Sequence, residues 1–251
     1  MKRLTVVLFL TAVALSAAPL SAPAQTADSL IAKYIQASGG MERIQAIQSL
    51  RRTGKYTGGG GFEAVVKQEN KRPNHVREEF SIQGMTGINA YDGHDGWKIE
   101  PWQGRRDPES LGEEETHSIL DDADFDGPLV NYQAKGNHVE YQGVEQIEGS
   151  DAFKLKVTRP NGDVSFFYLD TEYYLPIRID IQWLIRGAPV ETEISLGDYK
   201  QVNGVYLPFS YEVGPKGSSS SDRGKTTYDK IDANVSLDDQ RFVRPGGGTR
   251  P

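Results

Sequence analysis

The stretch from Asp151 to Asp170, DAFKLKVTRPNGDVSFFYLD, decides the fold class of this chain. Apolar side chains alternate with lysines over 153–157, and a period of two indicates a strand with one buried face. Asn161-Gly162 follows, the dipeptide most typical of a tight hairpin turn, and an apolar return strand is predicted over 164–169. The stretch therefore predicts an antiparallel hairpin.

The same alternation continues on both sides of this hairpin. Short runs of valine, isoleucine and aromatic residues alternate with polar ones and are separated by glycine-rich or Asn-Gly turns. Further strands are predicted near 50–57, 62–70, 76–82, 88–91, 97–101, 177–183, 190–196, 205–213 and 226–231. The chain therefore contains about ten antiparallel strands.

Helical patterns are few and lie in two places. Asp28 can cap a helix that ends before two glycines, and a second helical piece is predicted over about 41–49. In the middle of the chain, Ser110 and Glu113 have the spacing of a capping box, which predicts a helix over about 110–123.

The expected fold is mainly β, with one long sheet and few helices. Such a sheet must bury its apolar face, so it either closes on itself or wraps around the helices. Both arrangements can leave an apolar cavity. No repeat and no change of composition marks a second domain, so we expect a single domain over 25–245 and a flexible tail over 246–251.

The N-terminus and the composition limit where the protein works. Lys2 and Arg3 precede a short apolar run, and Ala22-Pro23-Ala24 resembles a cleavage site, so residues 1–24 are predicted to be a cleaved signal peptide. The mature protein is then expected to be soluble in the periplasm. The chain has no cysteine, which excludes disulfides and thiolate chemistry. Its net charge of −7 disfavours nucleic-acid partners.

One motif resembles half of a calcium-binding loop. Asp122, Asp124 and Asp126 have the spacing of its first carboxylate ligands, and a glycine follows. The bidentate glutamate expected at the twelfth position is replaced by Gln133. These residues are weak calcium candidates, and an acidic helix end that runs into a turn is the simpler interpretation.

A second cluster raises the question of catalysis. Asp92, His94 and Asp95 could form a metal or acid–base group, but glycines among them make a hairpin turn the favoured interpretation. The sequence has neither the Gly-x-Ser-x-Gly nor the His-Glu-x-x-His pattern of hydrolases. No catalytic residue and no cofactor is therefore expected.

Several segments together resemble the outer membrane lipoprotein-sorting proteins, relatives of the periplasmic lipoprotein carrier LolA. The segments are YIQASGGMERIQAIQSLRRTGKY (34–56), RPNHVREEFSIQGMTGINAYDGHDGWKIEPWQG (72–104), DADFDGPLVNY (122–132), the hairpin of 151–170 and DYKQVNGVYLPFSYE (198–212). The resemblance implies an unclosed β-barrel of about eleven antiparallel strands that curls over helices. It also implies a cavity that shields the acyl chains of lipoproteins or other lipids without covalent chemistry. The implied partners are this acylated cargo and, transiently, envelope proteins at the inner and outer membranes.

The residues expected to line this cavity lie on the apolar faces of the helix and strands. They are Leu30, Ile31, Tyr34 and Ile35 on the first helix, and Phe80, Ile82, Phe153, Leu155, Phe166, Tyr168, Ile179, Ile181 and Trp183 on the strands. The period of two selects a face only where the other side is polar. Around Phe166–Tyr168 both sides are apolar, so the face there stays open.

Two other functions stay open beside the carrier. The same fold can serve as a structural or sensory envelope module that binds other proteins, which would show as a filled core without a cavity. A metal-assisted hydrolase would need Asp92, His94 and Asp95, or the acids of 122–126, to converge.

Overall fold

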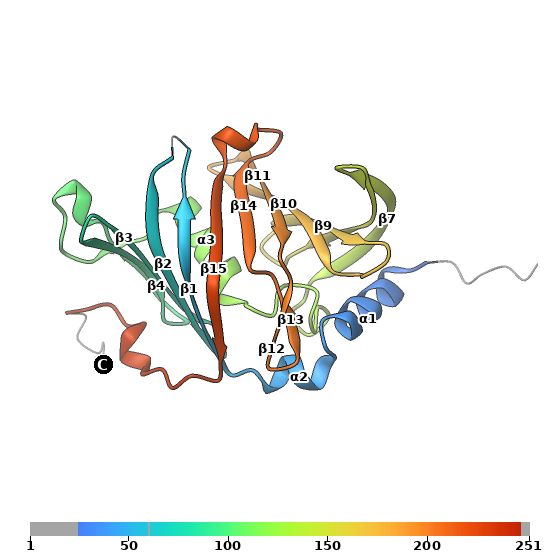
Figure 1. Ribbon diagram of the computed structural model, residues 1–251, viewed down its shortest axis with the longest axis horizontal. Coiled ribbons are helices and arrows are strands. Elements are labelled where there is room, and N and C mark those ends of the chain that lie inside the picture. The colour runs from blue at the N-terminus through green and yellow to red at the C-terminus, as the bar shows by residue number, and fades with distance from the viewer. Residues whose placement is uncertain (1–24, 60, 247–251) are drawn as a thin grey trace, which may run out of the picture.

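The computed structural model describes residues 25–59 and 61–246, and most of this chain is one antiparallel sheet (Figure 1). The expected signal peptide and all but the first residue of the expected tail lie outside the described residues. The strands of the main sheet are β1 (Ser49–Thr57), β2 (Glu63–Lys71), β3 (His75–Ile82), β4 (Met85–Tyr91), β5 (Gly96–Ile99), β6 (Glu109–Ser110), β7 (His138–Ile147), β8 (Ser150–Thr158), β9 (Val164–Asp170), β10 (Pro176–Ile185), β11 (Ala188–Gly197), β14 (Ser210–Pro215) and β15 (Gly224–Ala233). A separate hairpin contains β12 (Lys200–Val202) and β13 (Val205–Leu207).

The thirteen strands of the main sheet lie in the order β6-β5-β4-β3-β2-β1-β15-β14-β11-β10-β9-β8-β7. The C-terminal strand β15 lies beside β1 and so joins the two halves of the chain. The sheet curls without closing, since β6 and β7 are its edges (Figure 1). The predicted fold class, a mainly β chain with an unclosed antiparallel sheet over few helices, is confirmed, although the sheet has more strands than predicted.

Three α-helices and three 3-10 turns complete the described chain. The helices are α1 (Ala27–Ala37), α2 (Met41–Ala46) and α3 (Glu113–Ala123), and the turns are η1 (Pro101–Gln103), η2 (Ser220–Asp222) and η3 (Asp239–Arg241). Over the described ranges, none of the helices combines the length and the apolar character needed to cross a membrane.

The predicted helix ends need correction. Thr26, and not Asp28, caps α1, because its side chain accepts the backbone N–H of Ser29. The predicted capping box of Ser110 and Glu113 is wrong: Ser110 pairs with β5, and α3 begins only after Gly112. The backbone N–H of Gly112 donates to the Glu115 carboxylate over 2.7 Å. Since glycine has no side chain to accept a bond in return, only this half of a capping box forms, two residues further along.

Two strand predictions also change. Strand β7 was not expected, because a bulge between Tyr141 and Val144 reverses its alternation and hides the period of two. The single strand predicted over 205–213 is two strands, since Pro208 lacks the N–H that a continuous ladder needs.

Helices α1 and α3 cover different parts of the concave face of the sheet. Leu30 and Ile31 of α1 pack on β7, β8 and β9 and form the largest core cluster. Ile119 and Ala123 of α3 pack on Val76 of β3. The space between these two contacts becomes the cavity described below.

Candidate functional site

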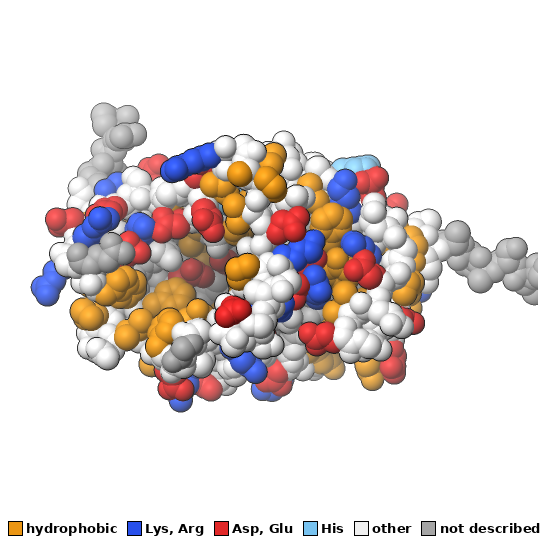
Figure 2. Space-filling view, turned by 90° about the horizontal axis from the view of Figure 1, so that it is seen from above, with side chains coloured by type: hydrophobic (Ala, Val, Ile, Leu, Met, Phe, Trp, Pro, Cys, Tyr) orange, Lys and Arg blue, Asp and Glu red, His pale blue; other side chains and the backbone are white. Residues whose placement is uncertain are grey.

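A cavity of about 390 Å³ lies between the concave face of the sheet and α3. The view from above shows a hollow on this side of the molecule, with hydrophobic side chains beside it and acidic side chains near its edge (Figure 2). Its volume lies in the range of about 300–1,000 Å³ that is typical of small-molecule sites. The cavity therefore has room for a ligand of that size.

One wall of the cavity is apolar and comes from neighbouring strands. Ile179, Ile181 and Trp183 of β10 alternate with polar residues, so all three point to the concave side. The wall continues on β11 through Ile194 and Leu196. This wall can bury hydrocarbon, with a gain of about 0.8 kcal/mol for each CH₂ group.

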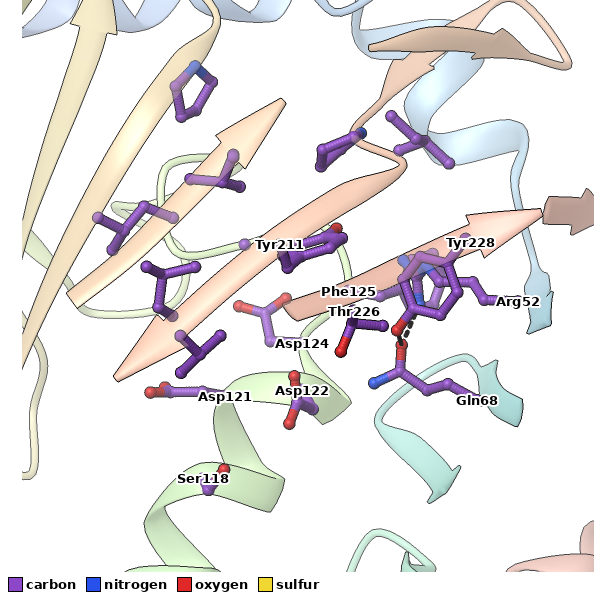
Figure 3. Close-up of a pocket in the computed structure, with 18 of the residues that line it drawn as sticks. Arg52, Gln68, Ser118, Asp121, Asp122, Asp124, Phe125, Tyr211, Thr226 and Tyr228 are labelled. Carbon is purple, nitrogen blue, oxygen red and sulfur yellow. Dashed lines mark hydrogen bonds between the residues drawn. The ribbon is translucent and has the colours of Figure 1, made fainter. Parts of the chain in front are cut away.

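The opposite wall is polar and comes from β1, β2 and β3. Arg52 donates from Nη1 to the Gln68 Oε1 over 2.8 Å and to the Asn70 Oδ1 over 2.6 Å. Gln68 in turn donates to the Glu78 carboxylate over 2.8 Å, and the Tyr228 hydroxyl lies 3.5 Å from the Gln68 oxygen (Figure 3). An arginine is thus held inside the fold by amide side chains.

Six carboxylates line this cavity, and four of them have a basic partner. Asp121 pairs with Arg159, Asp124 with Lys135, Asp126 with Arg72 and Glu79 with Arg77, at distances of 2.6–2.8 Å. Within the described residues, no ion pair joins Glu78 or Asp122 to a base. A neighbouring base therefore balances the charge of each of the other carboxylates, whereas Glu78 and Asp122 have no such partner.

The pKa values of Glu78 and Asp122 reflect this difference. Burial raises the pKa of Glu78, and the Gln68 hydrogen bond only partly opposes it. Burial raises the pKa of Asp122 further, and the negative charge of Glu78 adds to the effect. Asp121 and Asp122 project from the last turn of α3 toward β14 and β15, where Tyr211 and Tyr228 lie (Figure 3).

Three polar atoms around the cavity have no hydrogen-bond partner within the described residues. They are Arg52 Nε, Asp121 Oδ2 and the indole Nε1 of Trp183. Arg52 is 7% exposed and Trp183 is 6% exposed. Buried polar atoms normally have partners, so atoms without one beside a cavity indicate where a ligand could bind.

A second hollow of about 480 Å³ lies on the same face toward β4 and β5. Phe80 lines both hollows, and Phe62, Ile82 and Trp102 line only the second. Trp102 lies over Gly87, where an added Cβ would be 1.9 Å from the indole ring. The rim of the cavity thus carries large apolar side chains, of which Phe62 and Trp102 are exposed.

The structure places the thirteen predicted lining residues in four groups. Tyr34, Phe80, Ile179, Ile181 and Trp183 line the cavity, and Ile82 lines the second hollow. Leu30, Ile31, Phe153 and Leu155 form the packed core under α1, and Ile35 packs against it. Phe166 and Tyr168 pack with Ile147 and Ala152 in another cluster, while Phe167 faces the cavity.

The sequence prediction omitted the polar wall. Arg52, Gln68 and Glu78 occupy inward positions of strands whose neighbouring inward residues include Leu50, Val66 and Phe80. The signal was present, because a charged residue in the apolar register of a strand is unusual. Such residues are buried for a structural or a functional reason.

The calcium candidates do not converge in space. Asp124 binds Lys135 and Asp126 binds Arg72, whereas no ion pair of the described residues includes Asp122. Over residues 25–59 and 61–246, no group of three His, Asp or Glu side chains is arranged to hold a metal ion.

The group of Asp92, His94 and Asp95 forms the favoured hairpin turn. The backbone N–H groups of His94 and Asp95 both donate to the Asp92 carboxylate, over 2.9 and 2.8 Å. The turn therefore uses the Asp92 side chain and the backbone of His94 and Asp95.

Comparison with known proteins identifies the fold. No known family model and no curated protein matches the sequence. The structure is similar to a DUF1329 family protein from Desulfovibrio piger, with a TM-score of 0.57 and 15% identity over 86% of this chain and 97% of that one. It is similar to a LolA superfamily protein from Nitrosomonas europaea (TM-score 0.56, 14% identity, 88% and 98% coverage) and to an outer membrane lipoprotein-sorting protein domain from Vibrio parahaemolyticus (0.55, 11%, 86% and 97%). At these identities the comparison confirms the LolA-like fold predicted from the sequence.

Proposed function

We propose that this protein is a soluble periplasmic carrier that holds the acyl chains of a lipoprotein or another lipid in its cavity. The observation that carries the proposal is the cavity itself, an apolar wall on β10 and β11 that faces α3 across open space. Proteins with the same fold are described as lipoprotein-sorting or LolA superfamily proteins. No covalent step is part of this function, because an acyl chain needs only to be shielded from water.

The sequence suggests how the protein reaches its place of action and passes on its cargo. Residues 1–24 direct export and are removed, and the domain over 25–245 then takes up its cargo from one envelope partner and delivers it to another. The exposed aromatic side chains at the second hollow, Phe62 and Trp102, are suited to the transfer of an apolar chain at the rim.

The first test is native mass spectrometry of the mature chain, purified from periplasm without detergent. We expect a co-purifying mass that extracts as a lipid or an acylated peptide, and an intact chain that begins at Gln25. A clean apo mass that also takes up no added acyl ligand would contradict the carrier and favour the envelope interaction module.

Substitutions on one strand separate the cavity from the surface. Ile181→Glu places an unpaired carboxylate in the apolar wall, so we expect binding of a fluorescent acyl probe to be lost. Leu184→Glu on the same strand is the matched control, since Leu184 is exposed and does not line the cavity. A folded Ile181→Glu variant that binds as tightly as the control would remove this wall from the site.

A further inference from the structure

Arg52 lies in the cavity wall with one edge of its guanidinium unused. The residue is 7% exposed and lines the cavity. Its hydrogen bonds to Gln68 and Asn70 both leave from Nη1. Nε is buried without a partner, and no hydrogen bond of the described residues uses Nη2. Because all the nitrogens of a guanidinium are donors, the edge formed by Nε and Nη2 lacks an acceptor.

Other arginines of the described chain show what this edge of a guanidinium holds. Nε and Nη2 of Arg178 donate to the two carboxylate oxygens of Asp180, over 2.6 and 3.0 Å. The same two atoms of Arg223 donate to a single oxygen, the backbone carbonyl of Ser218, over 3.2 and 3.0 Å. The free edge of Arg52 therefore fits either a carboxylate or one carbonyl oxygen.

The acids near Arg52 favour the neutral acceptor. Glu78 and Asp122 line the same cavity, although no ion pair of the described residues joins either of them to Arg52. Burial raises the pKa of both carboxyls, and the charge of Arg52 partly opposes this rise. Arg52 thus already has acids within reach of its charge, and an arriving anion would be repelled by them. A neutral carbonyl oxygen accepts the same hydrogen bonds without this repulsion.

We propose that Arg52 recognises the carbonyl oxygen of an ester or amide at the end of an acyl chain, with Nε and Nη2 as donors and the hydrocarbon against β10 and β11. Hydrogen bonds from charged donors are the stronger ones, and a buried donor without an acceptor costs stability. The apolar wall opposite Arg52 suits a ligand in which one polar group ends a hydrocarbon chain. This proposal rests on the carrier function above and names the polar group of its cargo.

The test compares four ligands with chains of similar length: methyl decanoate, N-methyldecanamide, decyl methyl ether and decanoate. Each competes with a fluorescent acyl probe at neutral pH. The ether has a CH₂ group in place of the ester carbonyl, so hydrophobic binding alone would favour the ether. We expect methyl decanoate to bind about ten-fold more tightly than the ether, as one hydrogen bond from a charged donor provides. The ester and the amide distinguish the two linkages as the source of the carbonyl, and decanoate should bind more weakly than either.

Arg52→Lys tests the planar edge, because lysine keeps the charge and loses the paired donors of the guanidinium. It should lower the affinity for methyl decanoate to that for the ether and leave the ether unchanged. Arg51→Lys is the matched control, since Arg51 is the adjacent residue on the other face of β1, where its Nε donates to Glu69. The control should keep the preference for the ester. A loss there as large as that in Arg52→Lys would overturn the proposal.

A second measurement follows the carbonyl itself in the wild-type chain. A hydrogen bond lowers the stretching frequency of a carbonyl, so infrared spectra of methyl decanoate labelled with carbon-13 at this group report its partner. We expect the bound band below its position in an alkane solvent, and a bound band at the alkane position would overturn the proposal. Tightest binding of decanoate would overturn the neutral acceptor. Equal affinity for ester and ether would overturn the carbonyl site and leave the carrier standing, whereas no binding of any of the four ligands would refute both.

Discussion

Two parts of the concave face have the same alternation of apolar and polar residues, but one is packed core and the other is the wall of a cavity. The face of β7, β8 and β9 is covered by α1, and its side chains, such as Leu155, form a closed core with Leu30 and Ile31. The face of β10 and β11 has an equally apolar pattern, but α3 reaches it near Trp183, where the His117 ring lies 6.1 Å from the indole, and a cavity remains over Ile181 and Ile194. A period of two thus shows which residues share a face, while the covering helix decides whether that face becomes core or cavity.

The difference between the core under α1 and the cavity wall on β10 can be tested by shortening one side chain in each. Leu155→Ala should cost about 2–5 kcal/mol in the free energy of unfolding, because a fully buried side chain leaves a void. Ile181→Ala should cost about 2 kcal/mol, the lower end of that range, because it loses the transfer term of three carbons at about 0.8 kcal/mol each but encloses no new void beside the cavity. Urea unfolding measures both values.

For ligand binding, the order of the two variants should be reversed. Ile181→Ala should weaken acyl-probe binding, and Leu155→Ala should leave it unchanged at a temperature where the variant is folded. Equal losses of stability at the two positions would mean that β10 is packed like β8 and that the cavity is closed in solution.

The packed core and the cavity also differ in their acids, because an acid in the cavity lowers the free energy of unfolding. A carboxyl whose pKa is raised on folding destabilises the folded state at every pH above its ordinary value, since the unfolded chain gives up its proton more readily. Glu78→Gln should therefore raise the free energy of unfolding at pH 7 by about 1 kcal/mol, the usual size of a gain at a functional site. The gain should disappear as the pH falls below the ordinary value of 4.5.

Glu69 on the neighbouring strand provides the control of opposite sign. It is buried against Arg51 and Arg241, which hold the pKa of its carboxyl below the ordinary value despite burial. Glu69→Gln should lower stability at neutral pH, and the loss should shrink as acid protonates the wild-type carboxyl. Chemical unfolding from pH 7 to about pH 3 follows both variants through these protonations. A Glu78→Gln variant less stable than wild type at pH 7 would show that this acid is structural.

The sequence predicted those features that depend on the pattern of neighbouring residues along one strand. Alternation located β8, β9 and β10 and placed Ile181 and Trp183 on the side that now lines the cavity. Where both faces were apolar, as at Phe166–Tyr168, it could not choose between them, because each face packs against something.

Other features depended on contacts between distant segments. The polar wall was not predicted, because Arg52 and Glu78 come together only when β1, β2 and β3 pair. The distance between α3 and β10 is likewise set by packing on β3 and β4. The fold class was therefore predictable from pattern, whereas the cavity and its charge were not.

The smallest expected effect concerns the rim beyond the cavity, where Trp102 lies over Gly87. Gly87→Ala puts a methyl group where the indole now lies, and the ring is the free end of a side chain, so it should swing toward solvent. The strand should tolerate this change with a loss below about 1 kcal/mol. The tryptophan emission should shift to the red, and probe association should change more than affinity, because Trp102 lines the second hollow and not the cavity. Gly197→Ala is the matched control, a strand glycine with open space around its Cβ, and the same red shift there would show that Trp102 does not depend on Gly87 for its position.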